Sequence, residues 1–267
     1  MSPRRLGQHF LTDHKLLDRI VEALDVRAGE TVIEVGPGHG SLTEVLLDRG
    51  AQVIAIEKDR ELAENLRASY VVRRTSDLTV VDADALTVDW HAQLPRTTYD
   101  ARRTAFKVVG NIPYYITSPL IDKALTPPLP DRIVFLVQAE VADRLAAKPG
   151  GKIYGALSVG VQAVARVEKL FNVAAGAFRP PPRVRSTVIR LTPLVEPLVR
   201  PEEVPAFRAF VTTCFSKRRK QLKNAVLGLN EADLKALDFD PRVRPERLPA
   251  AAFVRLFRRA AATPASR

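Results

Sequence analysis

Short apolar runs alternate with amphipathic segments along the chain as far as Pro193. The apolar runs have the length and composition of strands, and they predict strands at Thr31–Val35, Gln52–Ile56, Leu78–Val81, Phe106–Gly110, Arg132–Val137, Ala163–Leu170 and Ser186–Leu191. The segments between them have helical period and predict helices at about Lys15–Leu24, Ser41–Asp48, Glu61–Ala68, Pro119–Leu125 and Glu140–Ala147. Strands that alternate with helices are typical of a doubly wound parallel sheet, so we expect an α/β fold.

The last two predicted strands are joined without a long helix. Their connection, Asn172–Arg185, is rich in turn residues, which allows antiparallel pairing of the two strands at the edge of the sheet. Beyond Pro193 further prolines interrupt the pattern, and short helices are expected at Val204–Phe215, Lys217–Leu227, Glu231–Leu237 and Pro249–Ala261. We therefore predict a large Rossmann-like domain over residues 1–194 and a small all-helical domain over residues 195–267, with the boundary near Thr192–Leu198.

Composition limits the classes of protein to which the chain can belong. No apolar run approaches the roughly 18–20 residues of a membrane-spanning helix, and Met1–Gln8 is basic and polar, so a cytoplasmic protein is expected. Cys214 is the only cysteine, which excludes an internal disulfide and a cysteine-based zinc site, and we expect no metal. The sequence does not determine the oligomeric state, for which a monomer is the default.

The chain carries 41 Lys and Arg against 30 Asp and Glu, a net charge of +11. Most of the excess lies in residues 195–267, which contain 15 basic and 8 acidic residues. Such a cluster favours a polyanionic partner, although a merely solubilising charge is the alternative. Within it, Lys217-Arg218-Arg219-Lys220 and Lys223 stand on a predicted helix without interleaved glutamates, and we predict that they contact RNA phosphates.

The segment from Glu34 to Gly40 has three alternate glycines between a predicted strand and a predicted helix. Glycines at Gly36 and Gly38 allow the backbone to approach a nucleotide, and Glu57 at the end of the next strand can accept the hydroxyls of a ribose. The spacing and the carboxylate of Glu34 favour S-adenosylmethionine over a nicotinamide dinucleotide, whose pyrophosphate requires Gly-x-Gly-x-x-Gly. A glycine turn that serves only chain reversal is the alternative without a ligand.

Two aspartates end the third strand, and the fourth strand ends in a second motif. Asp84, more than Asp82, is a candidate acceptor for the adenine amine of the cofactor. The second motif is Asn111-Ile112-Pro113-Tyr114, at the strand end where open α/β sheets place their active sites.

The chemistry of this second motif follows from its residue types. An aromatic amine is a poor nucleophile unless acceptors hold it, and the side-chain oxygen of Asn111 and the carbonyl of Ile112 are two such acceptors. Pro113 fixes the direction of that carbonyl, and Tyr114 offers a face for stacking a base. The motif therefore predicts methylation of an adenine amine without a metal or a general base, and an ordinary turn is the alternative.

At these residues the sequence resembles the rRNA adenine dimethyltransferases of the KsgA type and, more distantly, the Erm macrolide-resistance methyltransferases. The resemblance covers nearly the whole chain and includes further segments at Leu6–Leu11, Glu140–Leu145, Tyr154–Val159, Phe178–Val184 and Phe215–Leu222. It implies a Rossmann-like S-adenosylmethionine-dependent methyltransferase domain. It also implies that Tyr114 and Phe178 flank the target base, and that the cofactor is contacted by His9, Leu11, Gly36, Glu57, Asp84 and Asn111.

The resemblance leaves two substrates open. Members of the KsgA type are implied to dimethylate two adjacent adenines in the 3′-terminal hairpin of small-subunit rRNA within an immature subunit, whereas Erm-type members methylate one adenine of large-subunit rRNA. Ile112 is more typical of the Erm branch, but Tyr154–Val159, Pro180–Pro182 and Lys217–Leu222 favour the KsgA branch. Two other classes of protein are alternatives. The first is a ribosome assembly factor with secondary methylation, and the second is a nicotinamide-dependent oxidoreductase, which lacks the expected proton-transfer pair.

Overall fold

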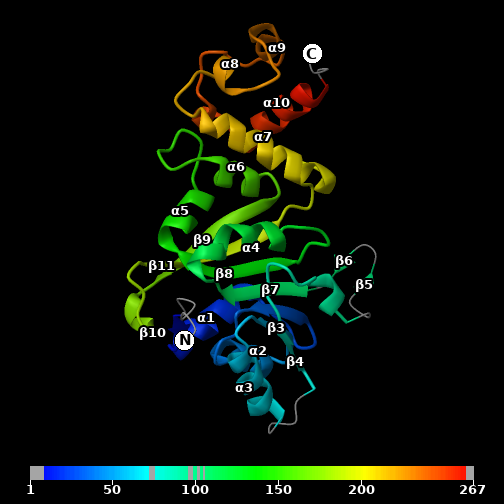
Figure 1. Cartoon of the computed structure of the whole chain (residues 1–267), viewed down its shortest axis with the longest axis vertical. Helices are drawn as coiled ribbons and strands as arrows, with labels where there is room; N and C mark the ends of the chain where they lie inside the picture. Colours follow the sequence, from blue (N-terminus) through cyan, green and yellow to red (C-terminus); the bar gives the residue numbers. More distant parts are fainter. Residues whose placement is uncertain (1–8, 72–75, 96–98, 101–102, 105, 263–267) are drawn as a thin grey trace, which may run out of the picture. The chain divides into compact units, whose positions relative to one another are not determined.

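The computed structural model describes residues 9–71, 76–95, 99–100, 103–104 and 106–262 of the chain (Figure 1). Residues 6–8 of the predicted motif Leu6–Leu11 lie outside this part. The chain divides into a sheet unit, residues 1–142 and 168–193, and a helical unit, residues 143–167 and 194–267. The second break, between Pro193 and Leu194, lies within the range expected from the sequence.

The sheet unit contains a sheet with strand order β4-β3-β2-β7-β8-β11-β9. Its strands are β2 (Thr31–Val35), β3 (Gln52–Glu57), β4 (Leu78–Asp82), β7 (Phe106–Asn111), β8 (Arg132–Gln138), β9 (Ala165–Val173) and β11 (Ser186–Pro193). The pairs between β4, β3, β2, β7 and β8 are parallel, and β11 is antiparallel to β8. As predicted, β9 and β11 are neighbours at one edge, so the α/β fold expected from the alternating pattern is confirmed.

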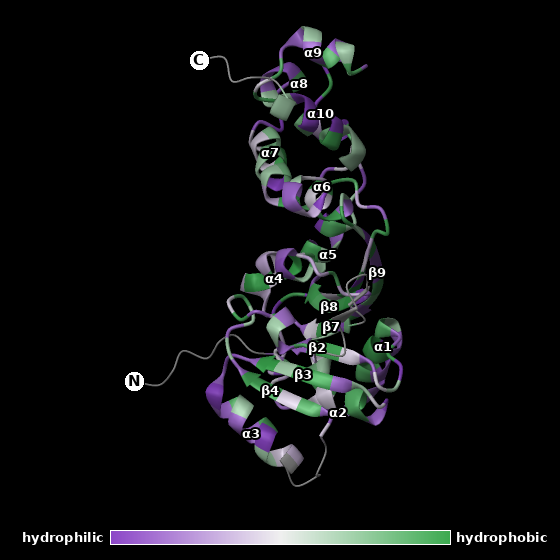
Figure 2. Ribbon diagram, turned by 90° about the vertical axis from the view of Figure 1, so that its right-hand side faces the viewer, coloured by the Kyte–Doolittle hydropathy of each residue, from purple (hydrophilic) through white to green (hydrophobic). Residues whose placement is uncertain are grey.

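Helices cover both faces of the sheet. The helices associated with the sheet are α1 (His14–Leu24), α2 (Ser41–Asp48), α3 (Arg60–Val71), α4 (Thr117–Ala124) and α5 (Ala139–Leu145). Figure 2 shows α1 and α4 on opposite sides of the sheet, whose central strands are largely hydrophobic. Every residue of β2 is buried, as a strand covered on both faces requires. Asp13 caps the start of helix α1, since its side chain accepts the Leu16 N–H.

Two short antiparallel pairs complete the described strands, and the sequence pattern did not predict them. They are β5 (Tyr99–Asp100) with β6 (Arg103–Thr104) and β1 (Phe10–Leu11) with β10 (Phe178–Arg179). The second pair matters for the site because it attaches the first described residues to the loop before β11. Runs of two residues are too short for any period to be detected. Short 3-10 turns lie at His91–Gln93, Tyr114–Ile116, Ala175–Ala177, Pro201–Glu203 and Pro245–Arg247.

The helical unit contains α6 (Ala156–Gln162), α7 (Val204–Ser216), α8 (Leu222–Ala225), α9 (Glu231–Ala236) and α10 (Ala250–Ala262). Its first segment, residues 143–167, was expected in the large domain. This segment packs instead with the C-terminal helices, since α6 contacts α7 and α10 and the buried Tyr154 donates a hydrogen bond of 2.9 Å to the Leu248 carbonyl. The helical unit therefore includes residues 143–167 in addition to the C-terminal residues from Leu194 onward.

The helix predicted over Lys217–Leu227 is wrong in its first half. Helix α7 ends at Ser216, Lys217–Lys220 form a turn, and α8 begins only at Leu222. The turn has a physical cause, because Arg218 bends back to Glu246 at 2.5 Å and donates to the backbone carbonyls of Gly151 and Lys152. Four consecutive cations therefore do not share a helix face.

Candidate active site

The glycine loop follows β2 and leads into α2. Gly36, Gly38 and Gly40 have φ angles of 68°, 58° and 85°, a left-handed region in which side chains are strained. A Cβ at Gly38 would lie 2.7 Å from the Phe10 ring. The loop therefore requires glycine for its conformation and, at Gly38, for space.

Glu57 ends β3 beside this loop. It is buried, with 5% of its surface exposed, and its Oε2 accepts the Gly38 N–H at 3.1 Å. Its Oε1 accepts the Asp59 N–H at 2.9 Å. Burial raises the pKa of Glu57, and these backbone hydrogen bonds oppose the shift. The site thus holds a carboxylate whose oxygens are fixed by the chain.

Glu34 is a second buried carboxylate, on β2 directly before the glycine loop. Its side chain accepts a hydrogen bond of 2.6 Å from the Thr43 hydroxyl. Burial raises the pKa of Glu34 to about 7, the Thr43 hydrogen bond lowers it, and the charge of Glu57 raises it further. Ionised Glu34 is therefore destabilised until a cation or a further donor approaches.

Asn111 ends β7, the neighbour of β2. Its Nδ2 donates a hydrogen bond of 2.6 Å to the His9 carbonyl, which orients the amide and leaves its oxygen as an acceptor. The next residue, Ile112, is buried, and its N–H donates a hydrogen bond of 3.1 Å to the Leu136 carbonyl. In the described part of the chain no hydrogen bond is made to the Ile112 carbonyl. Two acceptors, the side-chain oxygen of Asn111 and the backbone carbonyl of Ile112, thus lie in consecutive residues.

Tyr114 is held by two segments that are distant in the sequence. Its hydroxyl lies 2.9 Å from the hydroxyl of Ser186, a fully buried residue at the start of β11. The Tyr114 and His9 ring centroids are 6.1 Å apart with an interplanar angle of 30°. His9 is itself fixed, because its Nδ1 lies 2.8 Å from the Pro180 carbonyl. No local pattern in the sequence indicates these contacts of Ser186 and Pro180.

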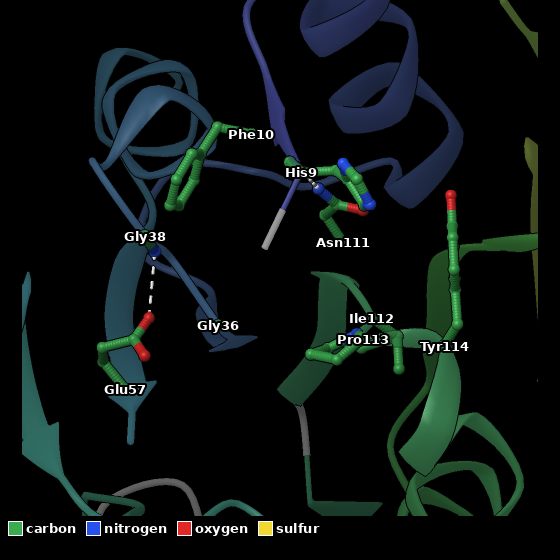
Figure 3. Close-up of a pocket in the computed structure, with 9 residues that line it drawn as sticks. All are labelled: His9, Phe10, Gly36, Gly38, Glu57, Asn111, Ile112, Pro113 and Tyr114. Atoms are coloured by element: carbon green, nitrogen blue, oxygen red, sulfur yellow. Dashed lines mark hydrogen bonds between the residues drawn. The ribbon is translucent and has the colours of Figure 1, made fainter. Parts of the chain in front are cut away.

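These groups surround one pocket, shown in Figure 3. Its volume, including its open mouth, is about 510 Å3. It is lined by His9, Phe10, Gly36, Gly38, Glu57, Asn111, Ile112, Pro113 and Tyr114. A second cavity of about 440 Å3 shares Phe10, Gly36 and Asn111 with it and reaches Leu11 and Glu34. Most of the predicted cofactor and base residues therefore meet at the carboxyl ends of β2, β3 and β7, where such sheets bind ligands.

Asp84 lies after β4 and does not line either cavity. Its Oδ2 accepts a hydrogen bond and ion pair of 2.8 Å from Lys58, and its Oδ1 accepts the Leu86 N–H. The Lys58 hydrogen bond holds the pKa of Asp84 below its ordinary value. Asp82 is exposed at the end of β4. Of the two aspartates, Asp84 is the one whose side chain the fold fixes, and its Oδ2 is already bonded to Lys58.

Phe178 does not fit the role expected for it. Its side chain is fully buried in the hydrophobic core, where β10 pairs it with Leu11, and it lines neither cavity. A ring without an exposed face cannot stack on a base in this arrangement. Phe10, which the sequence analysis did not single out, instead lines the pocket and lies 4.3 Å from His39 between ring centroids.

The predicted RNA-binding cations separate into two kinds. Lys217, Arg219 and Lys220 are exposed, and none of the three has an ion pair within the described residues. Arg218 is paired with Glu246, and Lys223 with Glu231 at 3.2 Å. Three of the five cations are therefore available to a polyanion.

No group of three or more His, Cys, Asp or Glu side chains that could hold a metal ion occurs in the described part of the chain. No helix there has the length and apolar character needed to cross a membrane.

Comparison with known proteins identifies the family. The ribosomal RNA adenine dimethylase family model matches residues 2–262. The chain is 42% identical to the ribosomal RNA small subunit methyltransferase A of Hahella chejuensis, covering 95% of this chain and 90% of the relative. The identity is 41% to the protein of the same name from Pseudomonas aeruginosa, with 99% and 96% covered.

Two solved structures are similar over nearly the whole chain. A dimethyladenosine transferase from Plasmodium falciparum has a TM-score of 0.77 and 26% identity, covering 95% of this chain and 98% of its own. The 23S rRNA methyltransferase ErmE has a TM-score of 0.72 and 29% identity, with 94% and 99% covered. With the family match, the similar folds and the pocket in agreement, the chain belongs to the ribosomal RNA adenine dimethylase family.

Proposed function

We propose that this rRNA adenine methyltransferase uses S-adenosylmethionine to dimethylate two adjacent adenines in the 3′-terminal hairpin of small-subunit rRNA. The observation that carries the proposal is the anchored amide of Asn111. Its Nδ2 is bonded to the His9 carbonyl at 2.6 Å, so its oxygen is left to accept a hydrogen bond in the pocket. The partner is proposed to be the rRNA of an immature subunit, and the protein to act as a cytoplasmic monomer.

The residues present fit the proposed methyl donor. The left-handed glycines at 36 and 38 form a cradle without side chains, and the buried Glu57 lines the same pocket. Glu57 would accept the ribose hydroxyls, and Glu34 in the adjoining cavity would face the amino group of the methionine part. Oδ1 of Asp84, which Lys58 does not contact, would accept a hydrogen bond from the adenine amine. When bound, S-adenosylmethionine would supply a methyl group on a cationic sulfur, which is already a strong donor.

The protein's own contribution is to position the target amine. The Asn111 oxygen and the Ile112 carbonyl would accept both of its hydrogens, which directs the nitrogen lone pair out of the purine plane. Pro113, with φ −55° and ψ 130°, fixes the peptide after Ile112. Tyr114 would stack on the base, and its hydroxyl is held by Ser186 at 2.9 Å. Such positioning can supply much of the rate without a general base.

Small-subunit rRNA is favoured over large-subunit rRNA by the curated relatives. Those of Hahella chejuensis and Pseudomonas aeruginosa are named small subunit methyltransferases at 42% and 41% identity, whereas the large-subunit enzyme ErmE is 29% identical. Unmodified small and large subunits incubated with labelled donor would separate the two. We expect two adjacent dimethyladenines in small-subunit rRNA, and label confined to the large subunit would overturn this choice.

A purely binding role in subunit assembly is tested by Asn111→Ala. Loss of one preorganised acceptor is expected to lower kcat by about 100-fold or more while RNA binding is largely kept. Binding of RNA is measured by filter retention and methyl transfer by the incorporated label. Full activity of the variant would contradict the catalytic assignment, and loss of RNA binding as well would point to a folding defect.

A further inference from the structure

The segment from Arg179 to Ser186 is joined to the pocket at both ends. At one end, β10 pairs with β1 and the Pro180 carbonyl binds His9 at 2.8 Å. At the other end, the Arg185 carbonyl accepts the Ala139 N–H at 2.9 Å and Ser186 binds the Tyr114 hydroxyl. The segment, here called the rim segment, therefore connects two residues that line the pocket, His9 at one end and Tyr114 at the other.

Three prolines stiffen this rim segment, which also presents arginines to solvent. Pro180, Pro181 and Pro182 each fix one φ angle and reduce the conformations open to the segment. Arg183 and Arg185 are exposed, as is Val184 between them. Cationic groups on a stiff segment lose little backbone entropy when they bind a ligand, so they are suited to fixed contacts.

The two arginines differ from several others of the sheet unit. Arg49, Arg60, Arg132 and Arg190 are each paired with a carboxylate. Within the described residues, neither Arg183 nor Arg185 has a hydrogen bond or ion pair through its guanidinium group. Their charges are thus uncompensated beside a pocket proposed for a base of RNA, and the phosphates of the RNA backbone carry the opposite charge.

We propose that Arg183 and Arg185 form a phosphate-binding rim that holds the RNA backbone beside the adenine in the pocket. This inference rests on the proposed function, because it takes the occupant of the pocket to be an adenine of RNA. Guanidinium groups bind phosphate oxygens in a bidentate manner, and contacts of this kind fix the register of a nucleic acid without reading its sequence. The rim would act together with Tyr114, one holding the backbone and the other the base.

The test is a double variant, Arg183→Gln with Arg185→Gln, assayed with unmodified small subunits. We expect the KM for RNA to rise roughly ten-fold, and the slope of log affinity against log salt concentration to become shallower by about 1.4, which is two single-strand phosphate contacts. The donor Kd and kcat at saturating RNA should stay unchanged. An unchanged KM with an unchanged salt slope would overturn the proposal.

Arg27 supplies a matched control. It is also exposed and without an ion pair among the described residues, but it precedes β2 at the amino edge of the sheet, opposite the pocket. Arg27→Gln should leave KM and the salt slope unchanged. A second variant, Arg183→Lys with Arg185→Lys, keeps both charges and should retain the wild-type salt slope. A slope reduced as much as in the glutamine variant would contradict phosphate binding by these charges.

Hydroxyl-radical footprinting separates this inference from the proposed function. We expect the double variant to lose backbone protection next to the methylated adenines, whereas neutralising Lys217, Arg219 and Lys220 should change protection elsewhere. If the wild type fails to methylate adenine, the proposed function fails. The salt slope of binding still decides whether the rim contacts RNA phosphates. Methylation with protection that does not depend on Arg183 and Arg185 would refute the rim alone.

Discussion

In the Asn111–Tyr114 turn, each polar side chain is held by a partner from a distant segment, whereas three cations of the Lys217–Lys223 segment extend into solvent. Asn111 is bonded to the His9 carbonyl and Tyr114 to Ser186. Lys217, Arg219 and Lys220 are exposed and have no ion pair in the part of the chain that the structure describes. Groups in a partly buried, fixed site respond to pH and to the loss of single atoms, while exposed cations respond mainly to salt.

The largest effect is expected from the buried carboxylate next to the pocket. Glu34 has an ordinary pKa of 4.5 when unfolded and about 7 in the fold, so the folded protein binds more protons between these values. The stability that this difference contributes is complete below pH 4.5 and is lost as pH rises through 7. The loss amounts to about 3 kcal/mol at most.

Glu34→Gln keeps a Thr43 acceptor but removes the charge. We expect its free energy of unfolding, measured by denaturant titration between pH 5 and 8, to vary less with pH than that of the wild type and to exceed it at pH 8. The same variant should bind the donor more weakly, because the amino group would lose an ionised partner. Parallel stability curves for the two proteins would show that Glu34 is not the titrating group.

The next effect concerns the face of Tyr114. Tyr114→Ala removes a stacking surface worth about 1–3 kcal/mol per base, so kcat/KM for RNA should fall roughly 10- to 100-fold. The donor Kd, measured by calorimetry, should be unchanged, since the ring is expected to contact the base and not the donor. Tyr114→Phe, which keeps the face and loses only the hydroxyl, is the control and should lose much less, roughly five-fold. A loss of equal size in the phenylalanine variant would assign the effect to the hydroxyl instead.

The sequence predicted this turn better than the basic segment for a physical reason. The Asn111–Tyr114 chemistry depends on the strand end, on Pro113 and on residue types, all of which are local features. The orientation of the Arg218 side chain depends on its ion pair with Glu246, which lies 28 residues away in the sequence, and no local pattern indicates that pair. The same holds for Phe178, because its burial follows from pairing with a two-residue strand at the opposite end of the sheet unit's sequence.

The basic segment is expected to give a smaller effect that depends on salt. Replacing the exposed Lys217, Arg219 and Lys220 by Gln should weaken RNA binding roughly ten-fold near physiological salt and make the salt slope shallower by about 2. Arg218→Gln should instead lower the free energy of unfolding by about 1–2 kcal/mol, since a charged hydrogen-bonded pair is lost, with a smaller change in the salt slope. Filter binding over a salt series and denaturant titration distinguish these outcomes. A salt slope that changes only in Arg218→Gln would mean that Arg218, and not the three exposed cations, contacts the RNA phosphates.

The smallest effect concerns the bond between Tyr114 and Ser186, and its two partners should not behave alike. Tyr114→Phe leaves the hydroxyl of the fully buried Ser186 without its partner, whereas Ser186→Ala leaves the hydroxyl of a half-buried tyrosine that can reach water. The tyrosine substitution should therefore cost more stability, about 1–2 kcal/mol, than the serine substitution.

Activity is expected to follow a different rule from stability at this pair. Either substitution frees the ring to swing, so each should lower kcat by roughly five-fold, and the double variant should lose no more than either single one. A double-mutant cycle on kcat, with denaturant titration of the same four proteins, measures both quantities. Additive losses of kcat would mean that the bond does not position the ring. Additivity in kcat would also reduce the contrast with the Lys217–Lys223 segment, because activity would then not require a ring held by a partner from a distant segment.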